Sequence, residues 1–194
     1  DRKHGFINTK GEWVIEPTLG TWTNFNEGLA PFENEDRLWG FIDMSGEWAI
    51  KAQFEFAGWF SEGMAPVMIE GKWGYINKNG KIVIEPEFGG RYAWEFKDGL
   101  AAVVVDDKSA AINSKGEVLF TTEYKINTPF SDGLAIVFDE SYNSAVINAK
   151  GEIITDFNYS YIENFQDGFA LVILEGEMGA IDTNGKFIWR APLE

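Results

Sequence analysis

The chain repeats itself at an interval of 34 to 36 residues, and this period constrains the fold more than any other feature of the sequence. A short motif centred on an isoleucine occurs six times, at Ile7, Ile42, Ile76, Ile112, Ile147 and Ile181. Four residues after each isoleucine comes a glycine, at Gly11, Gly46, Gly80, Gly116, Gly151 and Gly185. A sequence of this kind must fold as an array of similar units.

A second motif lies between the copies of the first. It has the form Phe-x-Glu/Asp-Gly-x-Ala and begins at Phe25, Phe60, Phe96, Phe130 and Phe165. Its acidic residues are Glu27, Glu62, Asp98, Asp132 and Asp167. An acidic residue followed by glycine is typical of a tight turn. Because equivalent carboxylates suit a repeated turn better than catalysis, which needs groups in different environments, we interpret them as turn residues.

Between these turns the sequence predicts β-strands. The apolar segments are short, rich in β-branched and aromatic residues, and bounded by Gly, Asn and Asp. In the first cycle we expect strands near 28–34, 38–43 and 47–51, with a short fourth near 56–60. At the hairpin tips, Asn or Asp is able to adopt a positive φ and Gly closes the turn, which favours a short loop. The third strand is apolar at consecutive positions, so we expect it to be buried on both faces, with Trp13 and Trp48 in a core position.

One such sheet cannot cover its own apolar face, so the copies must stack on one another. The expected fold is all-β: tandem antiparallel repeats forming a five- or six-unit β-propeller-like array, with an open β-solenoid or a ribbon of hairpins as the alternative. We expect a single domain over residues 1–194. Its units are approximately 4–38, 39–72, 73–108, 109–143 and 144–177, with a partial unit at 178–194.

The charge of the chain bears on its partners. The 194 residues carry a net charge of −15, which opposes binding to nucleic acid or to anionic lipid. The longest apolar runs, such as Leu100 to Val105, are far shorter than the roughly 20 residues that a membrane-spanning helix needs. No signal peptide is evident at residues 1–8, so the compartment stays open.

Few side chains are suited to catalysis or metal binding. There is no cysteine and a single histidine, His4, which occupies a position held elsewhere by Trp39 and Trp73 and so favours packing. Zinc would lack its usual ligands, and the acidic stretches 33–36, 106–107 and 139–140 lack the ligand spacing of a calcium loop. We therefore expect no metal, no cofactor and no enzyme. A glycoside hydrolase that uses a carboxylate pair is kept as a remote alternative.

The residues that repeat most faithfully resemble a known family. Lys72-Trp-Gly-Tyr-Ile-Asn77, followed by Gly80-Lys-Ile-Val-Ile84 and preceded by Phe60-Ser-Glu-Gly-Met-Ala65, is similar to the WG-repeat family of bacterial proteins. The later copies depart from this pattern, with Ala110 and Ala145 where glycine is expected. The resemblance implies a β repeat array that serves as a binding or scaffolding module, and it implies no catalytic residues.

The Trp-Gly pairs and the remaining aromatic residues receive different interpretations. Trp39-Gly40 and Trp73-Gly74 keep a fixed register, so we interpret the tryptophans as wedges between sheets and the glycines as points of close backbone approach. The aromatic and basic residues of the irregular stretches 18–24, 53–59 and 88–95 keep no register. These are Trp22, Trp59, Trp94, Tyr92 and Arg91.

Two interpretations of these irregular residues stay open: they fill space beneath loops, or they form a contact surface. As a surface they would bind a protein or peptide, or alternatively a carbohydrate at a bacterial cell surface. A cytoplasmic location and export after removal of a leader are both compatible with the sequence.

Overall fold

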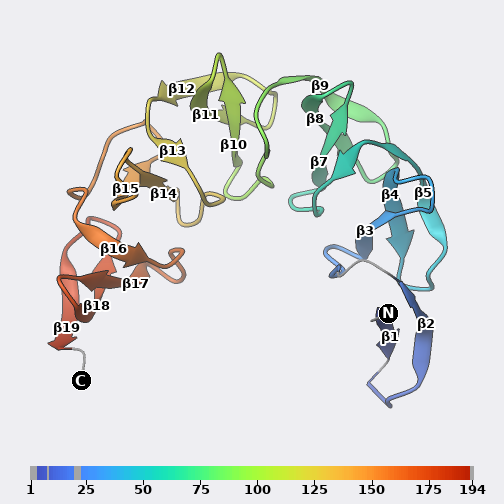
Figure 1. Cartoon of the computed structure of the whole chain (residues 1–194), viewed down its shortest axis with the longest axis horizontal. Helices are drawn as coiled ribbons and strands as arrows, with labels where there is room; N and C mark the ends of the chain where they lie inside the picture. Colours follow the sequence, from blue (N-terminus) through green and yellow to red (C-terminus); the bar gives the residue numbers. More distant parts are fainter. Residues whose placement is uncertain (1–3, 8, 20–22, 193–194) are drawn as a thin grey trace. The chain divides into compact units, whose positions relative to one another are not determined.

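The structure is a computed structural model that describes residues 4–7, 9–19 and 23–192 (Figure 1). Throughout these ranges the regular secondary structure consists of β-strands, without a helix. All strand pairs are antiparallel, as the sequence predicts. The chain divides into two compact units, residues 1–88 and 89–194, each described by itself below.

The first unit holds three sheets. Strands β1 (His4–Ile7) and β2 (Trp13–Leu19) form a hairpin. A three-stranded sheet follows in the order β3 (Leu29–Glu33), β4 (Trp39–Asp43), β5 (Trp48–Phe54). The third sheet has the order β6 (Phe56–Ala57), β7 (Met64–Ile69), β8 (Lys72–Asn77), β9 (Ile82–Phe88). The three strands expected in the first cycle match β3, β4 and β5, and the short fourth strand is β6, which joins the next sheet.

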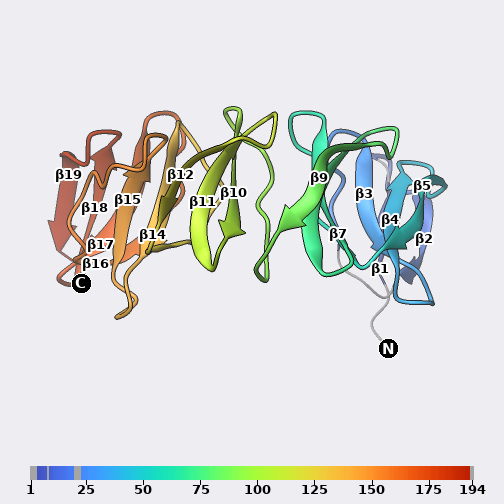
Figure 2. The same ribbon diagram turned by 90° about the horizontal axis from the view of Figure 1, so that it is seen from above.

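The second unit continues the same pattern (Figure 2). Its first sheet contains β10 (Leu100–Val105), β11 (Lys108–Asn113) and β12 (Val118–Thr122). Next come β13 (Lys125–Ile126), β14 (Leu134–Phe138) and β15 (Ser144–Asn148), and then β16 (Tyr159–Ile162), β17 (Phe169–Leu174), β18 (Glu177–Asp182) and β19 (Phe187–Pro192). Strands β15 and β16 pair only at Ser144 and Tyr159, so these seven strands are two copies linked by one bridge.

Within each unit, neighbouring sheets share hydrophobic clusters. Along β14, Ala135 and Val137 pack in one cluster with Leu100 and Ala102 of the preceding copy. The alternate residues Leu134 and Ile136 of the same strand pack instead with Val172 of the following copy. Since successive side chains of a strand point to opposite faces, one short strand contributes to two hydrophobic interfaces. The hydrophobic core is thus distributed between the sheets.

The hairpin tips are held by side-chain acceptors. In the tip after β8, the Asn77 Oδ1 accepts the backbone N–H groups of Asn79 (3.0 Å) and Lys81 (3.1 Å). Only the glycine of this tip, Gly80, has a positive φ, of 76°. The short loop closed by glycine is as the sequence predicts, and the asparagines of the tip do not use the positive φ that they are able to adopt. The residue after each isoleucine is Asn or Asp because its side chain completes the turn, as Asp43, Asn113, Asn148 and Asp182 also do.

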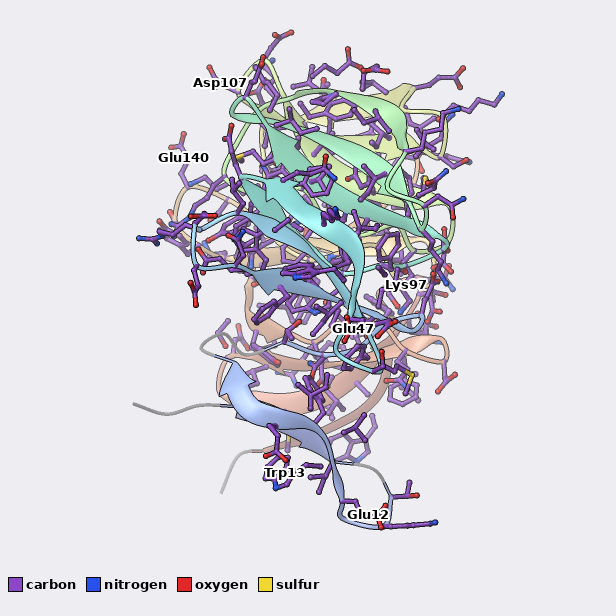
Figure 3. All side chains as sticks on the ribbon, turned by 90° about the vertical axis from the view of Figure 1, so that its right-hand side faces the viewer. Glu12, Trp13, Glu47, Lys97, Asp107 and Glu140 are labelled. Carbon is purple, nitrogen blue, oxygen red and sulfur yellow. The ribbon has the colours of Figure 1, made fainter. Side chains whose placement is uncertain are left out.

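The third strand of each copy is less buried than its sequence predicts. Trp13 and Trp48 are exposed, and Figure 3 shows Trp13 projecting from the first hairpin. The buried residue of this strand comes two positions later, at Ile15, Ile50 and Ile84. The reason is that β5 and β9 lie at the edges of their sheets, so only the side chain directed at the neighbouring sheet is covered. The expectation of burial on both faces is therefore wrong.

The Trp-Gly pairs lie where backbones crowd. A Cβ atom added at Gly40 would lie 2.5 Å from the carbonyl oxygen of Ile50, and one at Gly74 would lie 2.7 Å from that of Ile84. In the first unit the Phe56 ring packs against both Trp39, with ring centroids 4.8 Å apart, and Trp73, at 5.7 Å. Glycine is required at these positions because there is no space for a side chain beside the adjacent strand.

This crowding leads to a stability prediction. We expect Gly74→Ala to lower the free energy of unfolding by about 1–3 kcal/mol, because the added methyl group meets backbone atoms that cannot yield locally. Gly89→Ala is the matched control, since its added Cβ makes only an ordinary contact, at 3.8 Å from the Val104 carbonyl oxygen. Urea unfolding of both variants measures the difference. Equal stability of the two variants would contradict the crowding at Gly74.

The turn after β4 gives a pH prediction. The Ser45 hydroxyl and the backbone N–H groups of Ser45 and Glu47 donate to Asp43, and they hold the pKa of its carboxyl below the ordinary range. Because the pKa of Asp43 is lower in the folded than in the unfolded chain, its ionised carboxyl stabilises the fold at pH values above the unfolded-state pKa. This stabilisation is lost as the pH falls through the folded-state pKa. We expect NMR titration to show the low pKa. We also expect Asp43→Asn to remove this part of the acid sensitivity while keeping the turn, and an Asp43 midpoint in the ordinary range would refute the assignment.

Candidate binding site

The second motif forms a two-residue turn with an unusual backbone. Glu27 and Gly28 have φ values of 53° and 87°, and reciprocal hydrogen bonds between Asn26 and Leu29 close the turn. Both central residues of a type I′ turn need a positive φ, which side chains other than Asn, Asp and Gly rarely adopt. The acidic residue keeps this conformation in every copy: Glu62, Asp98, Asp132 and Asp167 have φ values of 53–55°.

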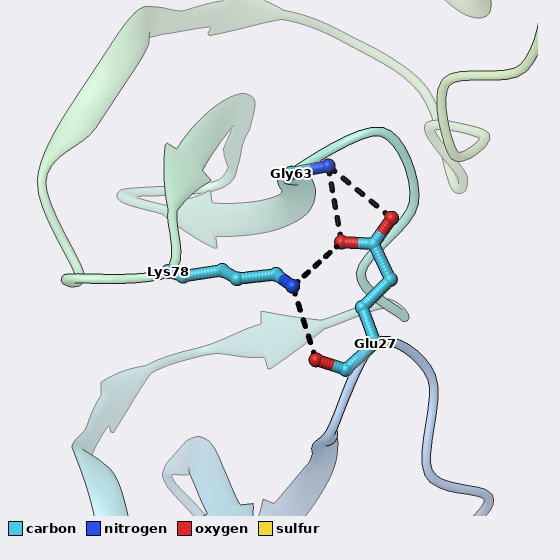
Figure 4. A network of polar contacts seen from close by, with 3 residues as sticks. All are labelled: Glu27, Gly63 and Lys78. Carbon is cyan, nitrogen blue, oxygen red and sulfur yellow. Dashed lines mark hydrogen bonds and ion pairs between the residues drawn. The ribbon is translucent and has the colours of Figure 1, made fainter.

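The acidic side chain of this turn joins one copy to the next. The Gly63 N–H donates to the Glu27 Oε2 at 3.1 Å (Figure 4). In the second unit the Gly133 N–H donates to Asp98 at 3.1 Å, and the Gly168 N–H donates to Asp132 at 2.8 Å. Each donor is the glycine of the next turn of the same kind. The carboxylates that the sequence marks as turn residues therefore also connect successive copies.

Further polar contacts lie beside these bridges. In the first unit the Lys78 ammonium donates to the Glu27 backbone carbonyl at 3.0 Å and pairs with its carboxylate at 3.1 Å (Figure 4). In the second unit the Lys97 ammonium donates to the Ser131 hydroxyl at 2.6 Å. The buried Ser131 hydroxyl in turn donates to the Phe165 carbonyl at 2.5 Å. The side chains of these turns therefore contact neighbouring turns and serve a structural role.

The irregular aromatic residues do not share one environment. Trp59, in the first unit, is exposed. In the second unit Trp94 is half-buried and packs against the hydrophobic cluster around Phe130, whereas Tyr92 is exposed with the Arg91 guanidinium 5.2 Å from its ring centre. Trp22 lies outside the described residues. Trp94 thus has a packing role, while Trp59, Tyr92 and Arg91 are accessible to a ligand.

A cleft of about 710 Å³ lies in the second unit. Its lining combines apolar side chains, such as Ile136, Phe138 and Phe169, with polar ones. The polar and aromatic residues that could contact a ligand include Asn127, Thr128, Tyr161, Glu163, Asn164 and Gln166. They come from the segments that lead into the second motif of the fourth and fifth copies, at 124–128 and 159–166. These segments correspond to the irregular stretches that the sequence singled out in earlier copies. They were missed because they hold no tryptophan, the residue that drew attention to the earlier stretches.

Two carboxylates, those of Glu163 and Asp167, belong to this cleft, and both residues are exposed. A general acid in a glycoside hydrolase needs a raised pKa, which burial in an apolar pocket provides. Burial raises the pKa of the Tyr159 hydroxyl, but Tyr159 lies outside the lining of this cleft. No cluster of three or more His, Asp or Glu residues within the described ranges could hold a metal ion. The lining is suited to hydrogen bonding more than to proton transfer.

Solved structures with the same architecture define the class of fold. The chain is similar to BamB from Moraxella catarrhalis (TM-score 0.60, 12% identity, 95% of this chain and 68% of that one). It is also similar to virginiamycin B lyase from Staphylococcus aureus (0.54, 16%, 97% and 76%). A third likeness is to the WD40 β-propeller domain of Doa1 (0.50, 12%, 88% and 68%). At these identities the likeness concerns the fold alone, which is an all-β, propeller-like repeat.

The sequence comparison specifies the family. The WG containing repeat matches residues 5–37, 39–73, 73–108, 111–140 and 146–177, and the chain belongs to this family. The resemblance drawn from the Trp-Gly motif is thereby confirmed. No curated protein sequence matches the chain. Among the described residues, no helix is long and apolar enough to cross a membrane.

The bridge between successive turns can be tested at Asp132. We expect Asp132→Gly to accelerate hydrogen exchange of the Gly168 amide roughly fivefold, as the loss of about 1 kcal/mol of protection implies. Glycine suits a positive φ, so the turn itself keeps its conformation.

Asp167→Gly is the matched control. It makes the same change in the same kind of turn, where the described residues offer the carboxylate no hydrogen-bond donor. The protection factor of the Gly168 amide, which corrects for the changed neighbouring residue, should keep its original value in this control. Equal exchange in wild type and Asp132→Gly would rule out a stabilising bridge.

Proposed function

We propose that this chain is a non-enzymatic repeat module that binds a protein or peptide. The observation that supports this function best is the cleft between the 124–128 and 159–166 segments. Its volume lies within the roughly 300–1,000 Å³ of ligand sites. Amide side chains at Asn127, Asn164 and Gln166 can both donate and accept hydrogen bonds, as a peptide backbone requires.

The charge of the cleft and of the chain favours a basic ligand. Glu163 and Asp167 line the cleft, and the whole chain has a net charge of −15. Charge complementarity accelerates the encounter of oppositely charged partners and excludes acidic ones. A peptide with Lys or Arg near a small apolar residue would satisfy both the carboxylates and the Tyr161 ring.

A carbohydrate ligand is the second candidate, because the Trp59 ring and the Arg91–Tyr92 pair are exposed. Flat aromatic surfaces of this kind could stack on sugar rings, as proposed from the sequence. Hydrolysis of a glycan would need the exposed Glu163 and Asp167 to act as a pair, and we rank it last. Fold likeness does not decide the question, since one of the similar structures is a lyase.

The peptide proposal is tested with a phage-displayed random peptide library selected on the purified chain. We expect selected peptides to be basic, and a labelled selected peptide to lose at least about tenfold in affinity with Tyr161→Ala. Tyr142→Ala is the matched control, because Tyr142 is exposed and lies outside the cleft lining. Binding should weaken as salt increases.

Two results would overturn the peptide proposal. One is a selected peptide whose affinity is unchanged by Tyr161→Ala. The other is salt-insensitive binding on a glycan array that is lost with Trp59→Ala in a chain with an unchanged melting temperature, which would support the carbohydrate alternative. Release of reducing sugar from the bound glycan, abolished by Glu163→Gln, would support the hydrolase.

A further inference from the structure

A second pocket lies in the second unit, beside the peptide cleft. Its volume is about 620 Å³, and it is formed by β13, the turn before it, and the loop between β14 and β15. Its lining includes two tyrosines, Tyr124 and Tyr142, and charged side chains of both signs, such as Lys125 and Glu140. Phe138 lines both sites, so the pocket adjoins the peptide cleft but presents different side chains.

The loop of this pocket is longer than the corresponding connections in the same unit. The five residues 139–143 connect β14 to β15. In contrast, two-residue turns connect β10 to β11, at 106–107, and β17 to β18, at 175–176. Loops that differ between copies of a repeat are where binding residues are most often found.

Side-chain hydrogen bonds order this longer loop. The Asp139 Oδ1 accepts the backbone N–H groups of Ser141 at 2.8 Å and Asn143 at 2.9 Å. Its Oδ2 accepts the Asn143 side-chain amide at 3.0 Å, and the Tyr142 N–H donates to the Asp139 carbonyl at 3.1 Å. The loop is therefore a defined element that holds Tyr142 in one place.

Tyr142 has a backbone conformation that suits glycine better. Its φ is 63°, in the left-handed region, which costs stability for a bulky side chain. The side chain is 74% exposed, so burial does not offset this cost. Residues in such conformations concentrate at functional sites. Arg37 has the same conformation, with a φ of 64°, in the corresponding loop of the first copy, and it lies outside this pocket.

The β13 side of the pocket is fixed as well. The Tyr124 ring packs on Phe157, with ring centroids 4.4 Å apart, and stays 37% exposed. The Lys125 ammonium lies 6.0 Å from the centre of the Tyr142 ring, and the described residues offer it no ion-pair partner. Glu123, in contrast, is paired with Lys108 at 2.6 Å. The donors of Lys125 are therefore free for a ligand.

We propose that this pocket binds an uncharged sugar of a glycan, which stacks on the Tyr142 ring and hydrogen-bonds to Lys125 and Glu140. An exposed tyrosine offers a flat apolar face that matches the C–H face of a sugar ring. Sugar hydroxyls both donate and accept, so they can use an ammonium and a carboxylate together. A charged ligand of either sign would meet a like charge in the pocket.

This proposal does not depend on peptide binding. A neutral sugar has no charge to screen, so its binding should change little with salt, whereas peptide binding to the acidic cleft should weaken. Tyr142 lies outside the cleft lining, so loss of its ring should leave peptide affinity unchanged. The pocket also differs from the exposed Trp59 ring and the Arg91–Tyr92 pair, which lie outside its lining.

The test is an array of neutral, sialylated and sulfated oligosaccharides, probed with the labelled 194-residue chain. We expect binding to neutral oligosaccharides, and Tyr142→Gly to weaken the affinity for a bound one at least about tenfold. Because glycine suits the backbone here, this variant should keep or raise the melting temperature. Lys125→Met keeps the aliphatic stem but removes the donors, and it should weaken binding about fivefold. Tyr142→Phe keeps the ring and should retain binding.

Arg37→Gly is the matched control, because it makes the same change in the same backbone conformation outside the pocket. It should leave glycan affinity unchanged. A chain that binds none of the neutral oligosaccharides would overturn the proposal. So would an affinity unchanged by Tyr142→Gly, or an equal loss with Arg37→Gly. Binding that is lost with Trp59→Ala and kept with Tyr142→Gly would also overturn it, because the sugar would then lie on the other aromatic surface.

Discussion

The structure depends on one constraint: an antiparallel sheet of three or four short strands has two apolar faces and can satisfy both only by packing between two similar sheets. Strand β14 shows this most directly, because its odd and even residues enter different hydrophobic clusters. Gly40 and Gly74 permit this packing because backbones approach closely there. Gly80 also permits it, since its turn lies over the buried Ile50 side chain of the preceding copy. The hydrogen bond between the acidic turns of two successive copies adds a polar link, which fixes how the two copies align with each other.

Most residues proposed to bind a ligand differ from the repeated residues that hold the copies together. The repeated residues are used by packing and by turns, as the bonds of Glu27, Asp98 and Asp132 demonstrate. Recognition must then come from positions at which the copies differ. The cleft in the second unit fits this expectation in part, since Asn127, Thr128, Glu163 and Asn164 lie in segments that differ between copies, whereas Asp167 is a repeated turn residue. The fold supports either a peptide or a sugar at such positions, and the amide-rich lining is the reason to prefer a peptide.

Much of the architecture could be predicted because it follows from local rules. A period near 35 residues, turn glycines and short β-branched segments suffice to place β3 and β4 within one residue, and β5 within three residues. One error arose where the outcome depends on tertiary position, because Trp13 and Trp48 are apolar but lie on edge strands. The role of the Asn77 side chain in completing its turn was not foreseen. The cleft was beyond sequence reasoning, because it requires knowing that residues 127 and 164 face the same space. Of the aromatic residues chosen as a surface, Trp94 packs into a core, and Trp22 lies outside the described residues.

The sharing of each strand between two interfaces also shapes how the molecule unfolds. Within each unit the middle sheet packs against a sheet on either side, so its opening breaks two interfaces, whereas the opening of an outer sheet breaks one interface of that unit. Within a unit, local opening should therefore be easier in the outer sheets than in the middle one. Unfolding would then resemble the melting of a one-dimensional lattice, in which domain boundaries move along the chain, more than the collapse of a single central core.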